Sequence, residues 1–312
     1  MNHKYQIVFF GSPKFVLPVL EFLYRNEELV GIVTQPDKPK GRGLKILPSP
    51  VKIWAQERNL KIFEPNKIKE ETFLRQMEDL SPDLIIVFAY GKILPKELLE
   101  IPREGAWNIH LSLLPKYRGA SPVQWTLLNG EIETGVTIML MDEGLDTGPI
   151  LLQKKIAIAE EDNSISLTEK LSELSVHALE EALTLLKDGK LIPKPQNHEE
   201  ATYAPLIKKE DGYITFNEEA TLIERKVRAF YPWPGTYTKF RDKILKIHSA
   251  KAMPNIMGHP VGSIIKIDKE GLLVATTKGA LLLKEVQLEG RQRVSAYQFA
   301  IGQRLKVGDL LL

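Results

Sequence analysis

Cysteine is absent from this sequence of 312 residues. Its absence excludes disulfide bonds, thiolate nucleophiles, iron–sulfur clusters and cysteine-ligated zinc sites. It also excludes the class of small secreted proteins that disulfides hold together. The redox compartment stays open, because a chain without cysteine is compatible with an oxidising or a reducing one.

Long apolar runs are absent as well. The longest, such as Leu84–Tyr90, are far shorter than the ~20 residues that a membrane-spanning helix needs. Near the N-terminus, the apolar run Ile7–Phe10 meets Gly11-Ser12-Pro13 directly, so we expect no signal peptide. These observations predict a cytoplasmic protein with no membrane partner.

A large excess of one charge sign is also missing, since the formal net charge is +2. The charges are nevertheless unevenly distributed. Residues 1–204 carry 24 Lys and Arg against 29 Asp and Glu, whereas residues 205–312 carry 18 against 11. A basic C-terminal third suggests a polyanionic partner, although chance clustering of solvated charges explains this imbalance equally well.

The elements expected in the first part of the chain indicate an α/β domain. Tyr5–Phe10, Phe15–Tyr24 and Leu29–Thr34 follow one another as strand, helix and strand, which is how a parallel sheet begins. Further strands are expected at 84–89, 106–110, 135–140 and 150–156, and helices at 51–58, 67–80, 122–129 and 166–187. We therefore expect a Rossmann-like catalytic domain with a mainly parallel sheet over residues 1–189.

The pattern changes after this domain. Residues 191–205 contain three prolines and show no periodicity, so we place a linker at 190–207. Residues 208–312 then show one helix, at 221–230, and short β-runs at 261–267, 271–276 and 280–285. Such spacing predicts a small, OB-like β-barrel as the C-terminal domain.

One pair of polar residues closes an apolar strand. In the segment 106–110, Asn108 and His110 would point to the same face because strand side chains alternate. Open α/β sheets bind ligands at the carboxyl ends of such strands. Taken alone, His110 is more readily explained as a strand-end histidine bonded to backbone.

A shaped acidic loop follows the next strand. It runs from Met141 to Pro149, contains two glycines, and carries Asp146 deep within it. We interpret its other two carboxylates, Asp142 and Glu143, as ordinary residues of an acidic turn. An amide, an imidazole and a carboxylate, without a Ser or Cys nucleophile, suggest direct acyl or formyl transfer. In that chemistry His110 would accept the proton of an attacking amine, Asn108 would donate to the carbonyl oxygen, and Asp146 would fix the imidazole tautomer.

The motifs together resemble the signature of the folate-dependent formyltransferases. They are Asn108-x-His110, Ser112-Leu113-Leu114-Pro115, Tyr117-Arg118-Gly119 and Asp142-x-Gly144-x-Asp146-Thr147-Gly148. Over its whole length the chain is similar to the branch of this family that formylates methionine carried by initiator tRNA. The features outside the core are Phe10-Gly11-Ser12, Thr34-Gln35-Pro36-Asp37-Lys38-Pro39 and Ala229-Phe230-x-Pro232-Trp233-Pro234-Gly235.

This resemblance implies the substrates and the site. The donor would be 10-formyltetrahydrofolate, the acceptor the α-amino group of methionyl initiator tRNA, and no metal would take part. Asn108, His110 and Asp146 would be the catalytic residues. The folate site would comprise Ser112, Leu113, Leu114 and Pro115, with Phe88, Ala89, Tyr90 and Gly91 nearby. We expect the enzyme to be a monomer.

Two basic regions would bind the tRNA. The first is a strand-free loop at 36–45, whose candidate contacts are Lys38, Lys40, Arg42 and Lys45. Arg42 matches the family's key arginine, and arginine can bind phosphate bidentately and stack on bases. The second is the linker end, where Lys208 and Lys209 are the candidates. Relatives often carry lysine where Leu206 stands, so one phosphate contact would be missing here.

Other functions stay open at this point. The acceptor could be an amino sugar, or the enzyme could hydrolyse formyl-tetrahydrofolate. A non-enzymatic RNA-binding protein with a vestigial pocket is a third possibility. Identifying which acceptor becomes formylated would separate them.

Overall fold

The computed structural model describes residues 4–40 and 45–311, which divide into two compact units. The first comprises Met1–Pro122, Glu133–Ala157 and Thr168–Pro205. The second comprises Val123–Ile132, Ile158–Leu167 and Leu206–Leu312. The C-terminal unit thus includes two segments from the middle of the chain. The boundaries expected from the sequence, at 189 and 207, stay a prediction.

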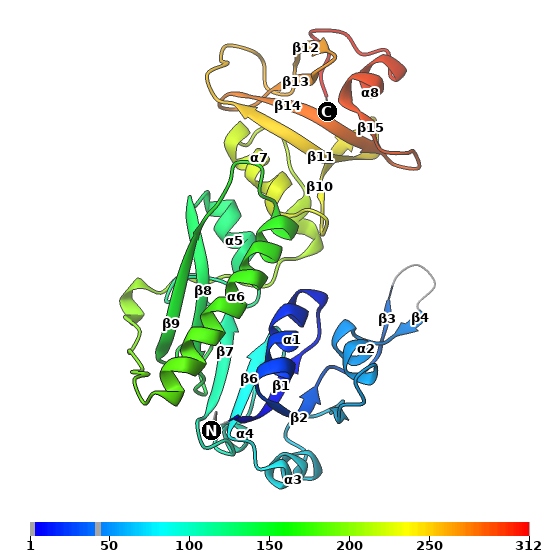
Figure 1. Cartoon of the computed structure of the whole chain (residues 1–312). Coiled ribbons are helices and arrows are strands. Elements are labelled where there is room, and N and C mark those ends of the chain that lie inside the picture. The colour runs from blue at the N-terminus through cyan, green and yellow to red at the C-terminus, as the bar shows by residue number, and fades with distance from the viewer. Residues whose placement is uncertain (1–3, 41–44, 312) are drawn as a thin grey trace. The chain divides into compact units, whose positions relative to one another are not determined.

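A seven-stranded sheet forms the centre of the first unit, in the order β5-β2-β1-β6-β7-β8-β9 (Figure 1). The strands from β5 to β7 are parallel, and β8 is antiparallel to both of its neighbours. This arrangement confirms the predicted α/β class with a mainly parallel sheet. The strands are β1 (Gln6–Gly11), β2 (Glu28–Val33), β5 (Ile62–Phe63), β6 (Leu84–Phe88), β7 (Ala106–His110), β8 (Glu133–Leu140) and β9 (Ile150–Ala157).

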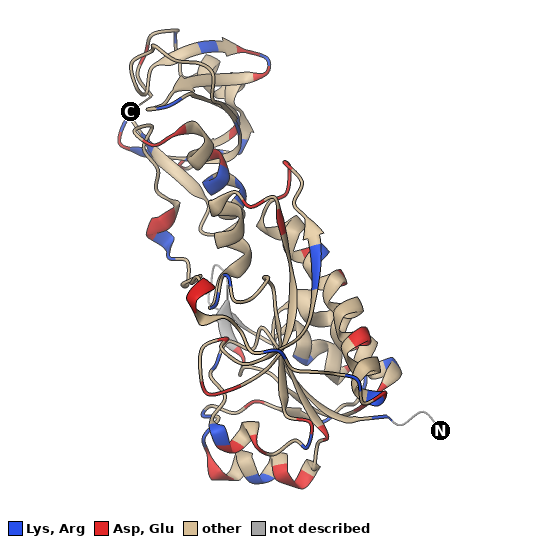
Figure 2. Cartoon of the chain, turned by 90° about the vertical axis from the view of Figure 1, so that its left-hand side faces the viewer, with Lys and Arg blue, Asp and Glu red and all other residues tan. Residues whose placement is uncertain are grey.

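Both faces of the central strands are buried, which explains their nearly continuous apolar sequences. In β1, Val8 and Phe10 pack into a core cluster that also includes Phe73 and Met77 of helix α3. The opposite face is covered by α1 and α6, which lie side by side in Figure 1. Lys187, the last residue of α6, forms an ion pair with Glu27, which directly follows α1. The helices are α1 (Leu17–Asn26), α2 (Pro50–Gln56), α3 (Glu71–Leu80), α4 (Lys96–Leu99), α5 (Pro122–Asn129) and α6 (Ser164–Lys187). Charged residues of both signs alternate over the helices of this unit (Figure 2).

The second unit is built on an antiparallel sheet in the order β10-β11-β14-β13-β12, with β15 paired to β14. Its apolar face packs against α7 (Ala220–Ala229) and α8 (Ala296–Gly302), with Ile223, Val227 and Phe299 in the core. The antiparallel C-terminal unit agrees with the predicted fold class. The strands are β10 (Thr236–Phe240), β11 (Lys243–Met253), β12 (Ile264–Asp268), β13 (Gly271–Ala275), β14 (Ala280–Leu288) and β15 (Val294–Ser295).

The structure corrects one local expectation. The basic segment at 36–45 was expected to contain no strand, but β3 (Lys38–Lys40) and β4 (Lys45–Leu47) pair as an antiparallel hairpin. Pro39 is tolerated because this two-stranded sheet consists of edge strands alone. None of the helices that the structure describes is long and apolar enough to cross a membrane.

Candidate active site

The site begins at the carboxyl end of β7. Asn108 pairs with Val87 of β6 on one side and with Met139 of β8 on the other, while His110 lies opposite Thr137. The strand is buried except at Asn108, which is half-buried. An amide and an imidazole therefore share one face of a strand in the middle of the sheet, as the alternation predicts.

Asp146 reaches this pair from the loop that follows β8. Its Oδ1 accepts a hydrogen bond from Asn108 Nδ2 at 3.3 Å, and its Oδ2 accepts one from the backbone N–H of Gly119 at 2.8 Å. The same Oδ2 lies 3.7 Å from His110 Nδ1. The three side chains predicted from the sequence thus converge, although Asp146 lies 38 residues after Asn108 along the chain. Their catalytic roles stay a prediction.

The tautomer of His110 follows from its backbone partner. His110 Nε2 lies 2.9 Å from the carbonyl oxygen of Tyr117, which can only accept, so Nε2 carries the proton. Nδ1 of the neutral ring is then the basic nitrogen, and it faces Asp146. Asp146 was expected to fix the tautomer; instead the Tyr117 carbonyl does so. Because the 3.7 Å separation exceeds a hydrogen bond, Asp146 lies beside the ring as a nearby negative charge and not as its hydrogen-bond partner.

The loop that presents Asp146 requires its two glycines. A Cβ at Gly148 would lie 1.8 Å from the Leu140 carbonyl oxygen, and one at Gly144 would lie 1.9 Å from Thr147 Oγ1. Asp142 Oδ1 accepts from the Gly144 N–H and from the Thr147 hydroxyl, which supports its interpretation as a turn residue. Asp146 itself has a φ of +53°, unusual for a residue with a side chain.

The predicted folate residues differ in what they can offer a ligand. Phe88 and Tyr90 are each 1% exposed, and the Tyr90 ring packs edge-on against Phe10 in the core. Only Ala89 and Gly91 of this stretch are exposed, so it could contact a ligand mainly through its backbone.

The second folate stretch, residues 112–115, is likewise largely buried. Ser112 is fully buried, and its hydroxyl donates to the Lys116 carbonyl. Leu114 is 3% exposed and donates its N–H to Thr137 Oγ1. Leu113 and Pro115 are half-buried and are the two members of this stretch able to touch a ligand with their side chains.

The candidate tRNA contacts lie in both units. Lys38, Lys40 and Lys45 lie on the backbone of the β3–β4 hairpin, where Lys40 pairs with Lys45, and Arg42 falls outside the described residues. In the second unit, Lys208 and Lys209 are exposed at the start of a short 3₁₀ turn, and Leu206 is 69% exposed.

Sequence reasoning missed the backbone groups that complete the site. The Tyr117 carbonyl and the Gly119 N–H contact His110 and Asp146, and both come from the Tyr117-Arg118-Gly119 motif. That motif is part of the resemblance to the formyltransferases, but the sequence alone assigned no function to its residues. Gln196, within the expected linker, donates from Nε2 to the carbonyl oxygens of Asp146 and Gly148 at 2.9 and 2.7 Å. No local signal marks it in the sequence.

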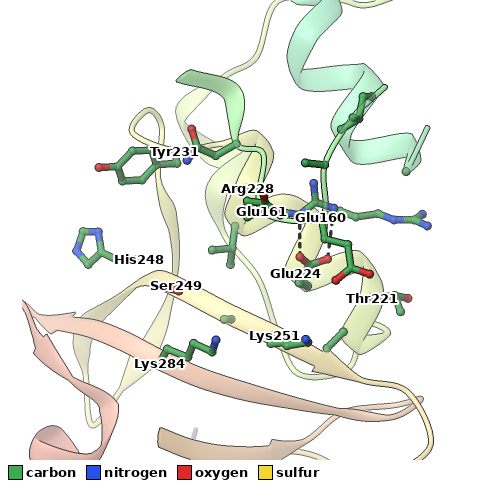
Figure 3. A pocket seen from close by; sticks show the side chains of 18 of the residues that line it. Glu160, Glu161, Thr221, Glu224, Arg228, Tyr231, His248, Ser249, Lys251 and Lys284 are labelled. Carbon is green, nitrogen blue, oxygen red and sulfur yellow. Dashed lines mark hydrogen bonds and ion pairs between the residues drawn. The ribbon is translucent and has the colours of Figure 1, made fainter. Parts of the chain in front are cut away.

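A pocket lies wholly within the C-terminal unit, away from the residues of β7 (Figure 3). This pocket of about 880 Å³ is bounded by α7, β11, β14 and residues 158–163. Several of its charged side chains are paired, as in the hydrogen bond between Arg228 Nε and Glu224 Oε1 at 2.7 Å. Burial lowers the pKa of its histidine, His248, which bonds Gln287. A lowered pKa favours the neutral imidazole. The groups at β7 are the stronger candidate for chemistry, because there a histidine, a carboxylate and an amide lie together.

No group of three or more His, Asp or Glu side chains within residues 4–40 and 45–311 is arranged to hold a metal ion.

Two protein-family models match this sequence. The one described as formyl transferase matches residues 5–183, and the one described as formyl transferase, C-terminal domain, matches residues 206–304. The chain belongs to the formyl transferase family. The motif resemblance noted in the sequence is thereby confirmed.

Two curated relatives within the formyl transferase family match over almost their full lengths. The methionyl-tRNA formyltransferase of Geobacter sulfurreducens is 44% identical over 98% of this chain and 96% of its own. That of Caldanaerobacter subterraneus subsp. tengcongensis is 45% identical over 98% of this chain and 99% of its own.

Solved structures of more distant proteins share the fold. An N-formyltransferase from Helicobacter canadensis, solved with folinic acid and dTDP-3-aminofucose, is 18% identical and superposes with a TM-score of 0.68 over 93% of this chain and 100% of its own. HypX from Aquifex aeolicus, solved in complex with tetrahydrofolic acid, is 18% identical and superposes with a TM-score of 0.62 over 96% of this chain and 47% of its own.

Proposed function

We propose that this enzyme transfers the formyl group of 10-formyltetrahydrofolate to the α-amino group of methionine on charged initiator tRNA, for translation initiation. The observation that carries the proposal is the 44–45% identity to two methionyl-tRNA formyltransferases over 98% of the chain. The cluster of Asn108, His110 and Asp146 supports the same chemistry independently, because it brings together a general base, a hydrogen-bond donor and a negative charge.

Each group of the cluster has a role in the proposed reaction. His110 Nδ1 accepts the proton that the attacking amine releases, while Nε2 stays bonded to the Tyr117 carbonyl. Asp146 stabilises the resulting imidazolium from 3.7 Å. The Asn108 side-chain amide donates to the formyl oxygen as negative charge develops there. No covalent intermediate with the enzyme is needed, since the amine attacks the formyl carbon directly. The bond from that carbon to N10 of the folate then breaks, and the His110 imidazolium returns the proton to the departing nitrogen, so that tetrahydrofolate leaves.

The residues present fit a folate donor at the end of β7. The exposed backbone at Ala89 and Gly91 and the half-buried Leu113 and Pro115 offer polar edges and apolar surface. For the acceptor, the β3–β4 hairpin and the lysines at 208 and 209 supply positive charge for phosphates. Cytoplasmic location, monomeric state and the domain boundaries at 189 and 207 belong to this proposal as well.

The deciding experiment supplies labelled 10-formyltetrahydrofolate and compares acceptors. We expect label on charged initiator tRNA, with far less on charged elongator tRNA and on small amines. Label on an amino-sugar nucleotide would instead indicate a sugar formyltransferase, and release of free formate without any acceptor would indicate a hydrolase. Either result would overturn the proposal.

A further inference from the structure

Gln196 holds the loop that presents Asp146. Its Nε2 donates to the carbonyl oxygens of Asp146 and Gly148, on either side of Thr147. Two bonds from a single rigid amide fix the backbone where Asp146 has its left-handed φ of +53°. Such a conformation persists only when its surroundings determine it.

A buried arginine fixes Gln196 in turn. Arg118 is 2% exposed, and its Nη2 and Nε donate to Gln196 Oε1 at 2.7 and 3.2 Å. The same Nη2 also donates to His198 Nδ1 at 3.2 Å. Because an arginine only donates, Oε1 must face it, and Nε2 must therefore face the loop. The amide of Gln196 cannot flip without leaving the guanidinium unsatisfied.

The position of Arg118 on a neutral amide is unusual. Within the described residues it forms no ion pair with a carboxylate, although burying a cation is costly unless it is well bonded. A charged donor on Oε1 polarises the amide, which strengthens the bonds that Nε2 donates. The buried cation thus reinforces the contact of Gln196 with the catalytic loop.

The backbone on both sides of Gln196 is anchored to the first unit. Lys194 and Ile150 exchange two backbone hydrogen bonds of 2.8 Å. Arg118 donates its N–H to Thr202 and accepts from Ala204 through its carbonyl. Although residues 190–207 were expected to be a linker, this part of them is packed beside the site.

We propose that Gln196 and Arg118 are positioning residues for catalysis, acting through Asp146. Without the two bonds from Nε2, the loop relaxes and the carboxylate leaves Asn108 and the Gly119 N–H. His110 Nδ1 then loses the carboxylate that lies 3.7 Å from it. This inference rests on the proposed formyl transfer and adds two residues to its machinery.

The informative substitution is Gln196→Glu. Glutamate still accepts both bonds from Arg118, so the buried cation stays satisfied, but it has no N–H to offer the loop. We expect kcat to fall about 10- to 100-fold, because a small misplacement of a catalytic group is costly, with KM unchanged for both substrates. The matched control is Asn197→Asp, the same amide-to-acid change at the exposed neighbouring residue, where kcat should stay unchanged.

A double-mutant cycle separates positioning from mere packing. If Gln196 acts through Asp146, Gln196→Glu should add almost nothing to the loss caused by Asp146→Asn. Losses that multiply, or a Gln196→Glu enzyme with wild-type kcat, would overturn the proposal. Thermal unfolding of each variant checks that the fold is retained.

Crystal structures of the wild type and the Gln196→Glu variant provide an independent readout. We expect Asp146 Oδ2 to leave the Gly119 N–H in the variant. A wild type without formyl transfer would overturn the proposed function alone, and these structures would then decide on the positioning role. An unmoved Asp146 in the variant would refute that role.

Discussion

At the scale of single residues, the site depends on what each polar group faces. His110 is 6% exposed at its side chain, with a carbonyl on one nitrogen and a carboxylate near the other. That environment leaves one lone pair, on Nδ1, to take a proton. A base with one available nitrogen, held on a central strand, needs no reorientation during the reaction.

We predict that His110→Ala lowers kcat by about 10²–10⁴ while folate and tRNA affinity stay nearly unchanged, because only proton transfer is lost. Steady-state kinetics with both substrates varied would measure this. His177→Ala, at an exposed position on α6, is the control and should behave as wild type. Weakened binding with intact turnover would remove His110 from its role as base.

Tyr90 illustrates a residue whose burial has a measurable consequence. Its hydroxyl is buried without a hydrogen-bond partner among the residues that the structure describes, and burial raises the pKa of Tyr90 from 10.0 to about 12. A raised pKa favours the neutral folded form. The stability that Tyr90 contributes is therefore complete below pH 10 and is lost as the pH rises through about 12.

We predict that Tyr90→Phe removes this alkaline loss, which amounts to about 2–3 kcal/mol between pH 10 and 12. At pH 7 the variant should be as stable as wild type or more so by about 1 kcal/mol, because no buried hydroxyl is left unsatisfied. Urea unfolding at pH 7, 10 and 11.5 tests both statements. A variant clearly less stable at pH 7 would indicate a hydroxyl partner.

At the scale of elements, the sequence predicts best where one periodicity dominates. Strand β7 and helix α5 begin and end at the expected residues. The hairpin of β10 and β11 was not expected, because its turn at Arg241 and Asp242 has positive φ at both residues without glycine or asparagine. The residue types at that turn therefore carried no clear hairpin signal.

The same reasoning applies to the candidate site. Asn108, His110 and Asp146 could be predicted because the residue types themselves carry chemistry. The Tyr117 carbonyl and the Gly119 N–H could not, since every residue has such groups and only the fold aims them. Gln196 lies in an aperiodic segment, and its role depends on Arg118, 78 residues away.

The loop after β8 provides a test at this scale. Gly148→Ala should lower the free energy of unfolding by about 1–3 kcal/mol, because its Cβ would overlap the Leu140 carbonyl oxygen at 1.8 Å. It should also lower kcat by moving Asp146. Gly302→Ala, in α8 with open space around the added carbon, should be neutral or slightly stabilising. Equal effects of the two substitutions, measured by thermal unfolding, would contradict this account of the loop.

At the scale of the whole molecule, the distribution of charge along the chain agrees with the functions proposed for its two parts. Residues 1–204 have a net charge of −5 and residues 205–312 one of +7. A polyanionic acceptor would be attracted by the basic C-terminal third and by the basic hairpin, while the proposed folate chemistry would take place at β7. Each phosphate that a basic side chain neutralises releases counterions, so tRNA binding should weaken steeply with salt.

Arg42 tests this electrostatic account. We predict that Arg42→Ala weakens the use of tRNA and reduces the slope of log affinity against log salt by about one, with KM for the folate donor unchanged. Arg75→Ala, which removes an arginine that is 71% exposed on α3, is the matched control and should leave the slope as it is. The measurement is KM for charged tRNA across a salt series, together with turnover of a small amine acceptor. An equal loss with the small amine would place Arg42 in catalysis rather than in tRNA binding.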